Sequence, residues 1–221
     1  MTLIKDYKII GSSSKGNCII VQKILMLDAG VTYKKLKYSL NGVKIIFVSH
    51  MHKDHLLPST IKQMAYNHPT LKYLTGSRGV VRKLYENGVK QNQIIFLKPG
   101  KWYDLSLLKV KLVQLYHDVE NCGLKWQING LKGIYIVDTN NVDGIIAKNY
   151  DLYLVENNYQ TEVWKKHLEE STDDGEIYYL NRVPETHLSA EQANSFLIEN
   201  MGDNSCFEYI HQSSYNYEGE E

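Results

Sequence analysis

The fold is decided by the stretch Ile45-Ile46-Phe47-Val48-Ser49-His50-Met51-His52-Lys53-Asp54-His55, in which an apolar run ends in a polar cluster. The run predicts a buried strand, and the cluster predicts a loop at the end of that strand. In extended backbone His50 and His52 project to one side, whereas the adjacent Asp54 and His55 aim at different points. This spacing suits two metal ions about 3.5–4 Å apart. The alternative is a solvated loop, but three of the eight histidines lie here directly after a core strand.

Length and composition indicate one globular domain. A chain of 221 residues can bury a substantial core, so we expect a single domain over residues 1–211 and a disordered polar tail over residues 212–221. The 25 basic and 25 acidic residues cancel, so no field of the whole molecule attracts nucleic acid or an anionic membrane. The start resembles no signal peptide, and no run approaches the roughly 20 apolar residues of a membrane span. A cytoplasmic protein without a membrane partner is expected.

The cysteines agree with a reducing compartment. They are odd in number, widely spaced and without a Cys-x-x-Cys pair, at positions Cys18, Cys122 and Cys206. This pattern argues against a disulfide framework and against a thiolate zinc site.

The remaining sequence alternates strand and helix signals. Strands are expected within residues 7–30, 44–48, 71–74, 94–97, 108–116, 124–128, 133–137, 151–155 and 206–210. Helices are expected at 33–40, from a Thr60–Gln63 capping box to 67, at 78–86, at 162–170, and from a Ser189–Gln192 capping box to 201. Asn129-Gly130 predicts a hairpin turn. The acidic segment 169–176 is expected to be a solvated loop.

A loop rich in glycine and serine, Gly11–Asn17, also contains a lysine. Such a loop can cradle phosphate, but this one lacks the Gly-Lys-Ser/Thr order of a P-loop and precedes a strand rather than a helix. We therefore expect a turn between two strands.

Further reactive residues also follow predicted strands. His117, Asp138 and His187 do so, and they converge with the histidine cluster at one edge if the strands share a sheet. The other histidines, His68, His167 and His211, have no such spacing and are expected to be surface or structural, with leaving-group acid as the alternative role. The fold class is α/β, interpreted as two mixed β-sheets stacked face to face with helices outside.

The run His50-x-His52-x-Asp54-His55, followed by His117, Asp138 and His187 at intervals of 62, 21 and 49 residues, resembles the metallo-β-lactamase superfamily over nearly the whole chain. The resemblance implies a four-layer αββα sandwich with two divalent transition-metal ions, Zn²⁺ or Mn²⁺. It implies that one ion is held by His50, His52 and His117, the other by Asp54, His55 and His187, with Asp138 bridging. Where the family often has Gly-Asp-Thr-Gly, this chain has Val137-Asp138-Thr139-Asn140, which affects the expected turn and not the ligand.

Three shorter motifs are similar to one branch of the superfamily. They are Gly11–Cys18, Leu27-Asp28-Ala29-Gly30 and His187-Leu-Ser-Ala-Glu-Gln. The branch contains small bacterial and phage proteins, including YycJ/WalJ-type exonucleases and phage phosphodiesterases of the anti-Pycsar type that degrade cyclic nucleotides.

The expected chemistry is hydrolysis through a metal-bound hydroxide. Two cations can lower the pKa of water from 15.7 to about 7 and can stabilise charge on a phosphoryl oxygen. Asp54 and His187 are the expected catalytic residues, with Asp54 orienting the hydroxide. Asp118 and Glu156 are candidate acceptors for the N–H groups of metal ligands, and solvent exposure is the alternative for each.

The substrate class is argued by exclusion. A secreted β-lactamase carries a signal peptide, and a β-CASP nuclease needs an insertion that the 49 residues from Asp138 to His187 leave no room for. Ribonuclease Z-like enzymes extend an arm to hold tRNA, and no candidate insertion or basic run for such an arm is found. A compact dinuclear phosphodiesterase or a thioester hydrolase remains, and the resemblance to the branch favours the phosphodiesterase and implies a cyclic nucleotide and a phage anti-defence role. Zero net charge favours a small nucleotide over a long strand. A local groove of Lys and Arg would reverse this order. The alternatives are a DNA/RNA exonuclease, a thioester hydrolase and a non-catalytic nucleotide-binding module. A small ligand exposes little surface, so we expect part of its pocket to come from a partner subunit, most simply in a two-fold homodimer.

Overall fold

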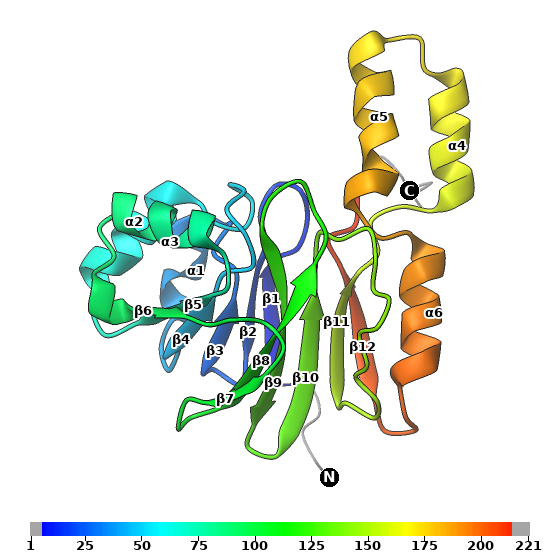
Figure 1. Ribbon diagram of the computed structural model, residues 1–221. Coiled ribbons are helices and arrows are strands. Elements are labelled where there is room, and N and C mark those ends of the chain that lie inside the picture. The colour runs from blue at the N-terminus through cyan, green and yellow to red at the C-terminus, as the bar shows by residue number, and fades with distance from the viewer. Residues whose placement is uncertain (1–5, 214–221) are drawn as a thin grey trace.

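Two six-stranded sheets face each other in the computed structural model, which describes residues 6–213 (Figure 1). In spatial order the first sheet contains β1 (Tyr7–Gly11), β2 (Cys18–Val21), β3 (Leu25–Leu27), β4 (Ile45–Phe47), β5 (Lys72–Thr75) and β6 (Ile94–Phe96). The second contains β12 (Cys206–Ile210), β11 (Leu152–Glu156), β10 (Leu131–Ile136), β9 (Asn121–Ile128), β8 (Lys109–Leu115) and β7 (Trp102–Asp104). Both sheets are mixed, because β3 to β6 and β10 to β12 run parallel whereas the other neighbours are antiparallel.

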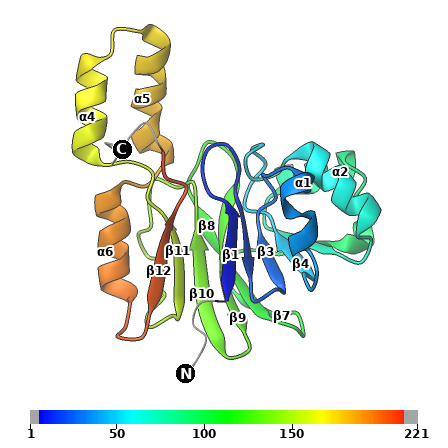
Figure 2. The same ribbon diagram turned by 180° about the vertical axis from the view of Figure 1, so that it is seen from behind.

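Helices connect the parallel strands, apart from β10 and β11, and cover the outer faces. On the first sheet these are α1 (Tyr33–Leu36), continued by the 3₁₀ turn η1 (Lys37–Ser39), then α2 (Pro58–Asn67) and α3 (Arg78–Glu86), with a second 3₁₀ turn, η2 (Gln91–Gln93), before β6. On the second sheet the cover is α6 (Ala190–Asn200), as both views show (Figures 1 and 2). This placement follows from connectivity, since parallel neighbours need a crossover segment that passes over one face of the sheet.

The strand β4 shows how the core is divided. Ile45 and Phe47 belong to the apolar cluster between the sheets, whereas Ile46 belongs to the cluster under the helices of the first sheet. Alternate residues of a strand point to opposite faces, so a strand covered on both faces needs an unbroken apolar run. The predicted sandwich of two mixed sheets with helices outside is confirmed.

Two helices depart from this layered plan. Helix α4 (Thr161–Glu170) pairs with α5 (Asp174–Thr186), and the pair stands beyond one end of the sandwich (Figures 1 and 2). The expectation of a loop over residues 169–176 is wrong in its second half, because Asp173 caps α5 by accepting a hydrogen bond from the backbone N–H of Glu176. Carboxylates in a first helical turn interact favourably with the helix dipole.

The two predicted capping boxes have different outcomes. The box of Ser189 and Gln192 at the start of α6 is formed with both of its hydrogen bonds. The box predicted from Thr60 is wrong: α2 begins two residues earlier with Pro58 at its first position, and the Thr60 hydroxyl donates to the carbonyl of Val31 instead. The Asn129-Gly130 turn joins β9 to β10, with both residues at positive φ as its type requires.

The predicted polar tail lies outside the described residues except for Gln212 and Ser213. Within residues 6–213 we find no helix long and apolar enough to cross a bilayer.

Candidate metal centre

The reactive side chains meet in one cavity of about 440 Å³. They come from loops that follow β4, β8, β10 and β12, and from the end of α5. The cavity lining includes His52, Asp54, His117, Asp138, His187 and His211. The side chains expected to converge do meet here, but His187 follows the helix α5 and not a strand, and the strands before the others belong to two facing sheets and not to one.

His50, His52 and His117 form the first group that could hold an ion, with one nitrogen of each within 4.8 Å of the others. His50 is fully buried, and its Nε2 makes no hydrogen bond to any described residue, although it lies 3.3 Å from Oδ2 of Asp138. Burial lowers the pKa of His50 and of His117. Both rings therefore favour the neutral form, whose free lone pair can bind a metal.

Asp54, His55, Asp138 and His211 form the second group. Nε2 of His55 lies 2.9 Å from Oδ2 of Asp138 and 3.3 Å from Oδ2 of Asp54. Nδ1 of His211 lies 2.9 Å from Oδ1 of Asp138, and its Nε2 lies 3.4 Å from Oδ2 of Asp54. Asp138 thus lies between the two groups, in contact with histidines of both.

His211 corrects the sequence analysis, which treated it as a surface or structural residue. It is only 3% exposed, and it completes the group of Asp54 and His55. The signal that could have found it is its position directly after the strand β12, which is the pattern that singled out His117 and Asp138. The other two histidines without such spacing, His68 and His167, do not line this cavity.

His187 belongs to a third group, with Asp138, Glu156 and His211. Its Nδ1 lies 2.7 Å from Oε1 of the fully buried Glu156, and the ring keeps 20% of its surface exposed at the cavity. Burial lowers the pKa of His187, but Glu156 and Asp138 outweigh burial and raise that pKa to about 9. In the absence of bound metal His187 is therefore a cation held by a carboxylate pair.

Glu156 and Asp118 both contact histidines of the site. Glu156 also accepts hydrogen bonds from the backbone N–H groups of Thr139 and Leu188, which fix its carboxylate. Asp118 is half-exposed: its Oδ1 lies 3.2 Å from Nε2 of His117, and its Oδ2 accepts a hydrogen bond of 2.8 Å from Arg182.

Asp28 is a buried carboxylate whose place the sequence analysis missed. It accepts hydrogen bonds from the backbone N–H and the hydroxyl of Ser49, from Nδ1 of His55 at 2.6 Å, and from the hydroxyl of Tyr135 at 2.7 Å. With its Nδ1 proton directed to Asp28, His55 turns Nε2 toward Asp54 and Asp138. In the sequence, Leu27-Asp28-Ala29-Gly30 indicates only a branch of the superfamily. One sequence does not show which carboxylate at a strand end contacts which histidine.

Helix α5 forms the opposite wall of the cavity. Tyr178, Tyr179 and Arg182 line it, and Tyr178 is 67% exposed. The guanidinium of Arg182 lies 5.9 Å from the centre of the Tyr178 ring. Because Arg182 also pairs with Asp118, this wall is tied to the histidine cluster.

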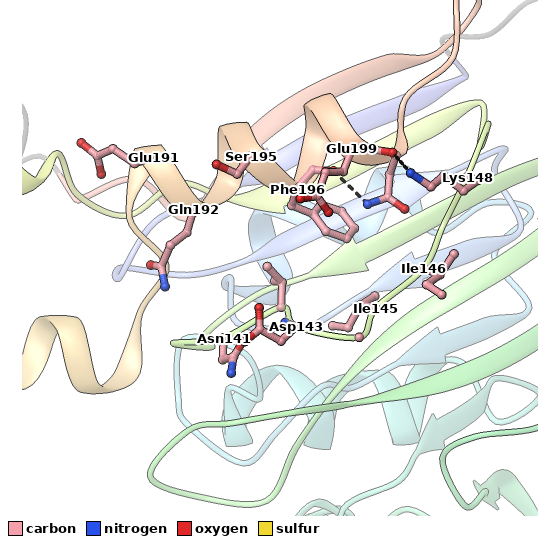
Figure 3. Close-up of a pocket in the computed structure, with 13 residues that line it drawn as sticks. Asn141, Asp143, Ile145, Ile146, Lys148, Glu191, Gln192, Ser195, Phe196 and Glu199 are labelled. Atoms are coloured by element: carbon pink, nitrogen blue, oxygen red, sulfur yellow. Dashed lines mark hydrogen bonds between the residues drawn. The ribbon is translucent and has the colours of Figure 1, made fainter.

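A second cavity, of about 360 Å³, lies between the segment 141–148 and α6 (Figure 3). Its lining includes Asp143, Lys148, Glu191 and Glu199 but none of the histidines described above. The metal-binding chemistry therefore belongs to the first cavity.

Comparison with known proteins gives a consistent result. A family model described as the beta-lactamase superfamily domain matches residues 24–202. Over 129 residues, 55% of this chain and 40% of the relative, the chain is 27% identical to ribonuclease Z from Pyrobaculum arsenaticum. Over 100 residues, 43% of this chain and 15% of the relative, it is 30% identical to cytidine monophosphate-N-acetylneuraminic acid hydroxylase from Asterias rubens. The chain thus spans less than half the length of these curated relatives.

Solved structures share the fold. Human tRNase Z, short form, has a TM-score of 0.68 and 15% identity, with 94% of this chain and 92% of that chain covered. A diphosphatase from the PhnP family has a TM-score of 0.63 and 12% identity, with 97% of this chain and 88% of that chain covered.

Proposed function

This chain belongs to the beta-lactamase superfamily domain family, and we propose that it is a metal-dependent hydrolase that cleaves phosphodiester bonds of nucleotides. The observation that carries the proposal is the pair of neighbouring ligand groups at one cavity, with Asp138 of the second group 3.3 Å from Nε2 of His50 in the first. The pair of His187 and Glu156 lies beside them.

We assign the ligands by their grouping. His50, His52 and His117 would hold one ion, and Asp54, His55 and His211 the other, with Asp138 between them. The family resemblance implies His187 as the third ligand of the second ion. We assign His211 in its place, because His211 is the histidine grouped with Asp54 and His55.

The donors fit two divalent transition-metal ions. Nε2 of His50 is buried without a hydrogen bond among the described residues, which is costly unless an ion occupies the site. The two groups offer imidazole and carboxylate without thiolate, a donor set that suits Zn²⁺ or Mn²⁺. When bound, such ions polarise a phosphoryl oxygen and make water a nucleophile at neutral pH.

His187 is proposed to protonate the leaving group. Glu156 binds Nδ1, so the ring is oriented and Nε2 remains to hold a proton at the cavity. A carboxylate that orients a histidine in this way stabilises its protonated form. Arg182, on the α5 wall, would bind the substrate's phosphate oxygens while it keeps Asp118 in contact with His52 and His117.

Tyr178 supports a nucleotide over a thioester. An exposed tyrosine ring beside a guanidinium offers one surface for a base and one group for a phosphate. Base stacking on an aromatic ring contributes about 1–3 kcal/mol and tolerates any base.

The charge of the α4–α5 pair favours a small substrate over a long polyanion. Residues 161–186 carry seven Asp and Glu side chains and three Lys and Arg side chains. This pair protrudes as an arm does, which the sequence analysis did not expect, but its net negative charge repels a phosphate backbone. We therefore favour a small nucleotide, cyclic nucleotides included, as in the phage anti-defence branch. An exonuclease activity is the second candidate, supported by the similarity to ribonuclease Z.

The test is a hydrolysis screen of protein loaded with Zn²⁺ or Mn²⁺. The substrates are bis-p-nitrophenyl phosphate, cyclic mononucleotides, cyclic dinucleotides, single-stranded DNA and RNA, and a glutathione thioester. We expect cleavage of the phosphodiesters, with cyclic nucleotides cleaved faster than strands. Cleavage of the thioester alone would overturn the proposal, and faster cleavage of strands with steep inhibition by salt would favour the exonuclease. Light scattering of the same sample measures the molar mass in solution and so tests the predicted homodimer.

A further inference from the structure

We propose that Lys15, Lys35 and Lys53 form an anion subsite beside the metal centre, which binds a second phosphate of the substrate. This inference rests on the proposed function and narrows its substrate class.

The subsite is a separate cavity of about 270 Å³. Its wall is made by the loop after β1, by the segment after β3 and by the loop after β4 that contains His50 to His55, here called the histidine loop. Ser14 and Asp54 line both this cavity and the one that contains the histidines. The two cavities are therefore neighbours, and one ligand can extend from the metal centre into the second.

The lysines converge from three segments of the chain. Lys15 lies in the Gly11–Asn17 loop, Lys35 in α1 and Lys53 in the histidine loop. All three are exposed, and none forms an ion pair with any of the residues 6–213. Among the described lining residues the only carboxylate is Asp54, a proposed metal ligand whose charge the ion would offset. This leaves a positive field directed at the cavity, which favours an anionic group.

The Gly11–Asn17 loop holds the subsite at a fixed place relative to the metal centre. The backbone N–H of Asn17 donates to the carbonyl of Asp54 at 2.7 Å, and the N–H of Gly30 donates to the carbonyl of Asn17 at 2.9 Å. A Cβ on Gly16 would lie 2.6 Å from the carbonyl oxygen of Gly30, so a glycine is needed for this close approach. The loop is no P-loop, yet it carries a lysine to the edge of the site.

The substrate that fits carries two phosphates separated by one nucleoside. One phosphate lies at the metal centre and the other at the lysines, with the intervening nucleoside near Ser14 and Asp54. A cyclic or linear dinucleotide, or the end of a strand, has this chemistry, whereas a cyclic mononucleotide lacks the second phosphate. Three lysines can bind one additional phosphate, but they are too few to bind the phosphates of a long nucleic-acid strand.

The experiment compares the linear dinucleotides pApA and ApA, which differ in one terminal phosphate. Binding to metal-free protein is measured by isothermal titration calorimetry, and kcat/KM is measured with metal-loaded protein. We expect wild-type protein to prefer pApA at least tenfold. The double variant Lys15→Ala/Lys35→Ala should lose this preference, and Lys15→Arg/Lys35→Arg should restore it. Lys62→Ala, an exposed lysine of α2 outside the cavity, is the matched control and should keep the wild-type ratio.

Equal affinity of wild-type protein for pApA and ApA would overturn the subsite, as would a wild-type preference in the double variant. Calorimetry on metal-free protein needs no turnover, so absence of all hydrolysis would refute the proposed function and leave the subsite to be judged by binding. Cyclic di-AMP and a decamer of the same sequence distinguish the source of the phosphate. Preference for cyclic di-AMP indicates a small nucleotide, and tighter binding of the decamer with a steeper salt slope indicates a strand end.

Discussion

Replacing Asp28 by Asn tests how the fold prepares His55 for metal. The carboxylate of Asp28 is buried and accepts four hydrogen bonds, one at Oδ1 and three at Oδ2. An asparagine keeps the shape but has one acceptor oxygen and one NH₂ group. If the oxygen replaces Oδ2, the NH₂ group faces the backbone N–H of Ser49, which is also a donor. If the NH₂ group replaces Oδ2, His55 must accept at Nδ1 and carry its proton on Nε2, the nitrogen that faces Asp54 and Asp138.

The expected losses of stability and of metal affinity in Asp28→Asn follow from these two arrangements. A hydrogen bond to a charged group contributes about 1.5–3 kcal/mol, and a buried donor left without a partner costs about 1–3 kcal/mol. Either arrangement of Asp28→Asn loses at least one bond and creates one conflict, so the free energy of unfolding should fall by roughly 2.5–6 kcal/mol. The second arrangement also blocks a ligand nitrogen. Loss of such an orienting partner lowers metal affinity about 10- to 100-fold.

The assay has two parts. Urea unfolding of metal-free protein, followed by circular dichroism, measures stability, and competition with a chromophoric chelator measures the affinity of each ion. Tyr135→Phe is the matched control: it removes one hydrogen bond to the same carboxylate but keeps the one from His55, so it should cost about 1.5–3 kcal/mol of stability and leave metal affinity near that of the wild type. An Asp28→Asn protein that binds both ions with wild-type affinity would refute the argument.

Four further substitutions have distinct expected results. His211→Ala should reduce the metal content at saturation from two ions per chain to one, whereas His187→Ala should keep two ions and lose turnover of bis-p-nitrophenyl phosphate; mass spectrometry of native protein counts the ions, and two ions in His211→Ala would contradict the assignment. Tyr178→Ala should raise KM for a dinucleotide about 5- to 150-fold, the factor for 1–3 kcal/mol of stacking, with kcat nearly unchanged. Burial lowers the pKa of Lys125 to about 8 from 10.5, so the unfolded chain binds more protons between these values and wild-type stability should rise with pH across that window. Lys125→Met removes this charge and also the hydrogen bond from Nζ to the carbonyl of Ile146. The stability of the variant relative to the wild type should therefore fall by roughly 1–3 kcal/mol as the pH rises from 8 to 10.5 in thermal unfolding, and a difference that does not change with pH would exclude the charge as its cause.

The sandwich was predictable because local signals and burial agree in it. The apolar run at Ile45 to Val48 is buried on both faces, and the Asn129-Gly130 turn takes the conformation that its residues favour. The α5 helix was missed for the opposite reason. Its last turn contains Pro184, which argues against a helix, although the acidic first turn and the Asp173 cap are signals of a helix start.

Six of the seven proposed ligands were predicted from the sequence, and the family resemblance was needed for His117 and Asp138, which lie far from the others in the chain. His50, His52, Asp54 and His55 lie within six residues, and the conformation of one loop brings them together. The choice between His187 and His211 depends on two elements far apart in the chain. One sequence shows that both are histidines beside regular structure, but not which one faces Asp54.

The pairing of β12 with β11 makes that choice and also joins the metal centre to the fold. The two strands run parallel, with Ile210 beside Glu156, so the residue after β12 arrives next to the carboxylate that ends β11. His211 is then held between Glu156 and Asp138 of the second sheet and Asp54 of the first. The second ion would therefore bind residues from both sheets, and its binding energy would be available only when the sheets are in contact. Metal binding should consequently stabilise the packing of the two sheets and not only the loops at their edges.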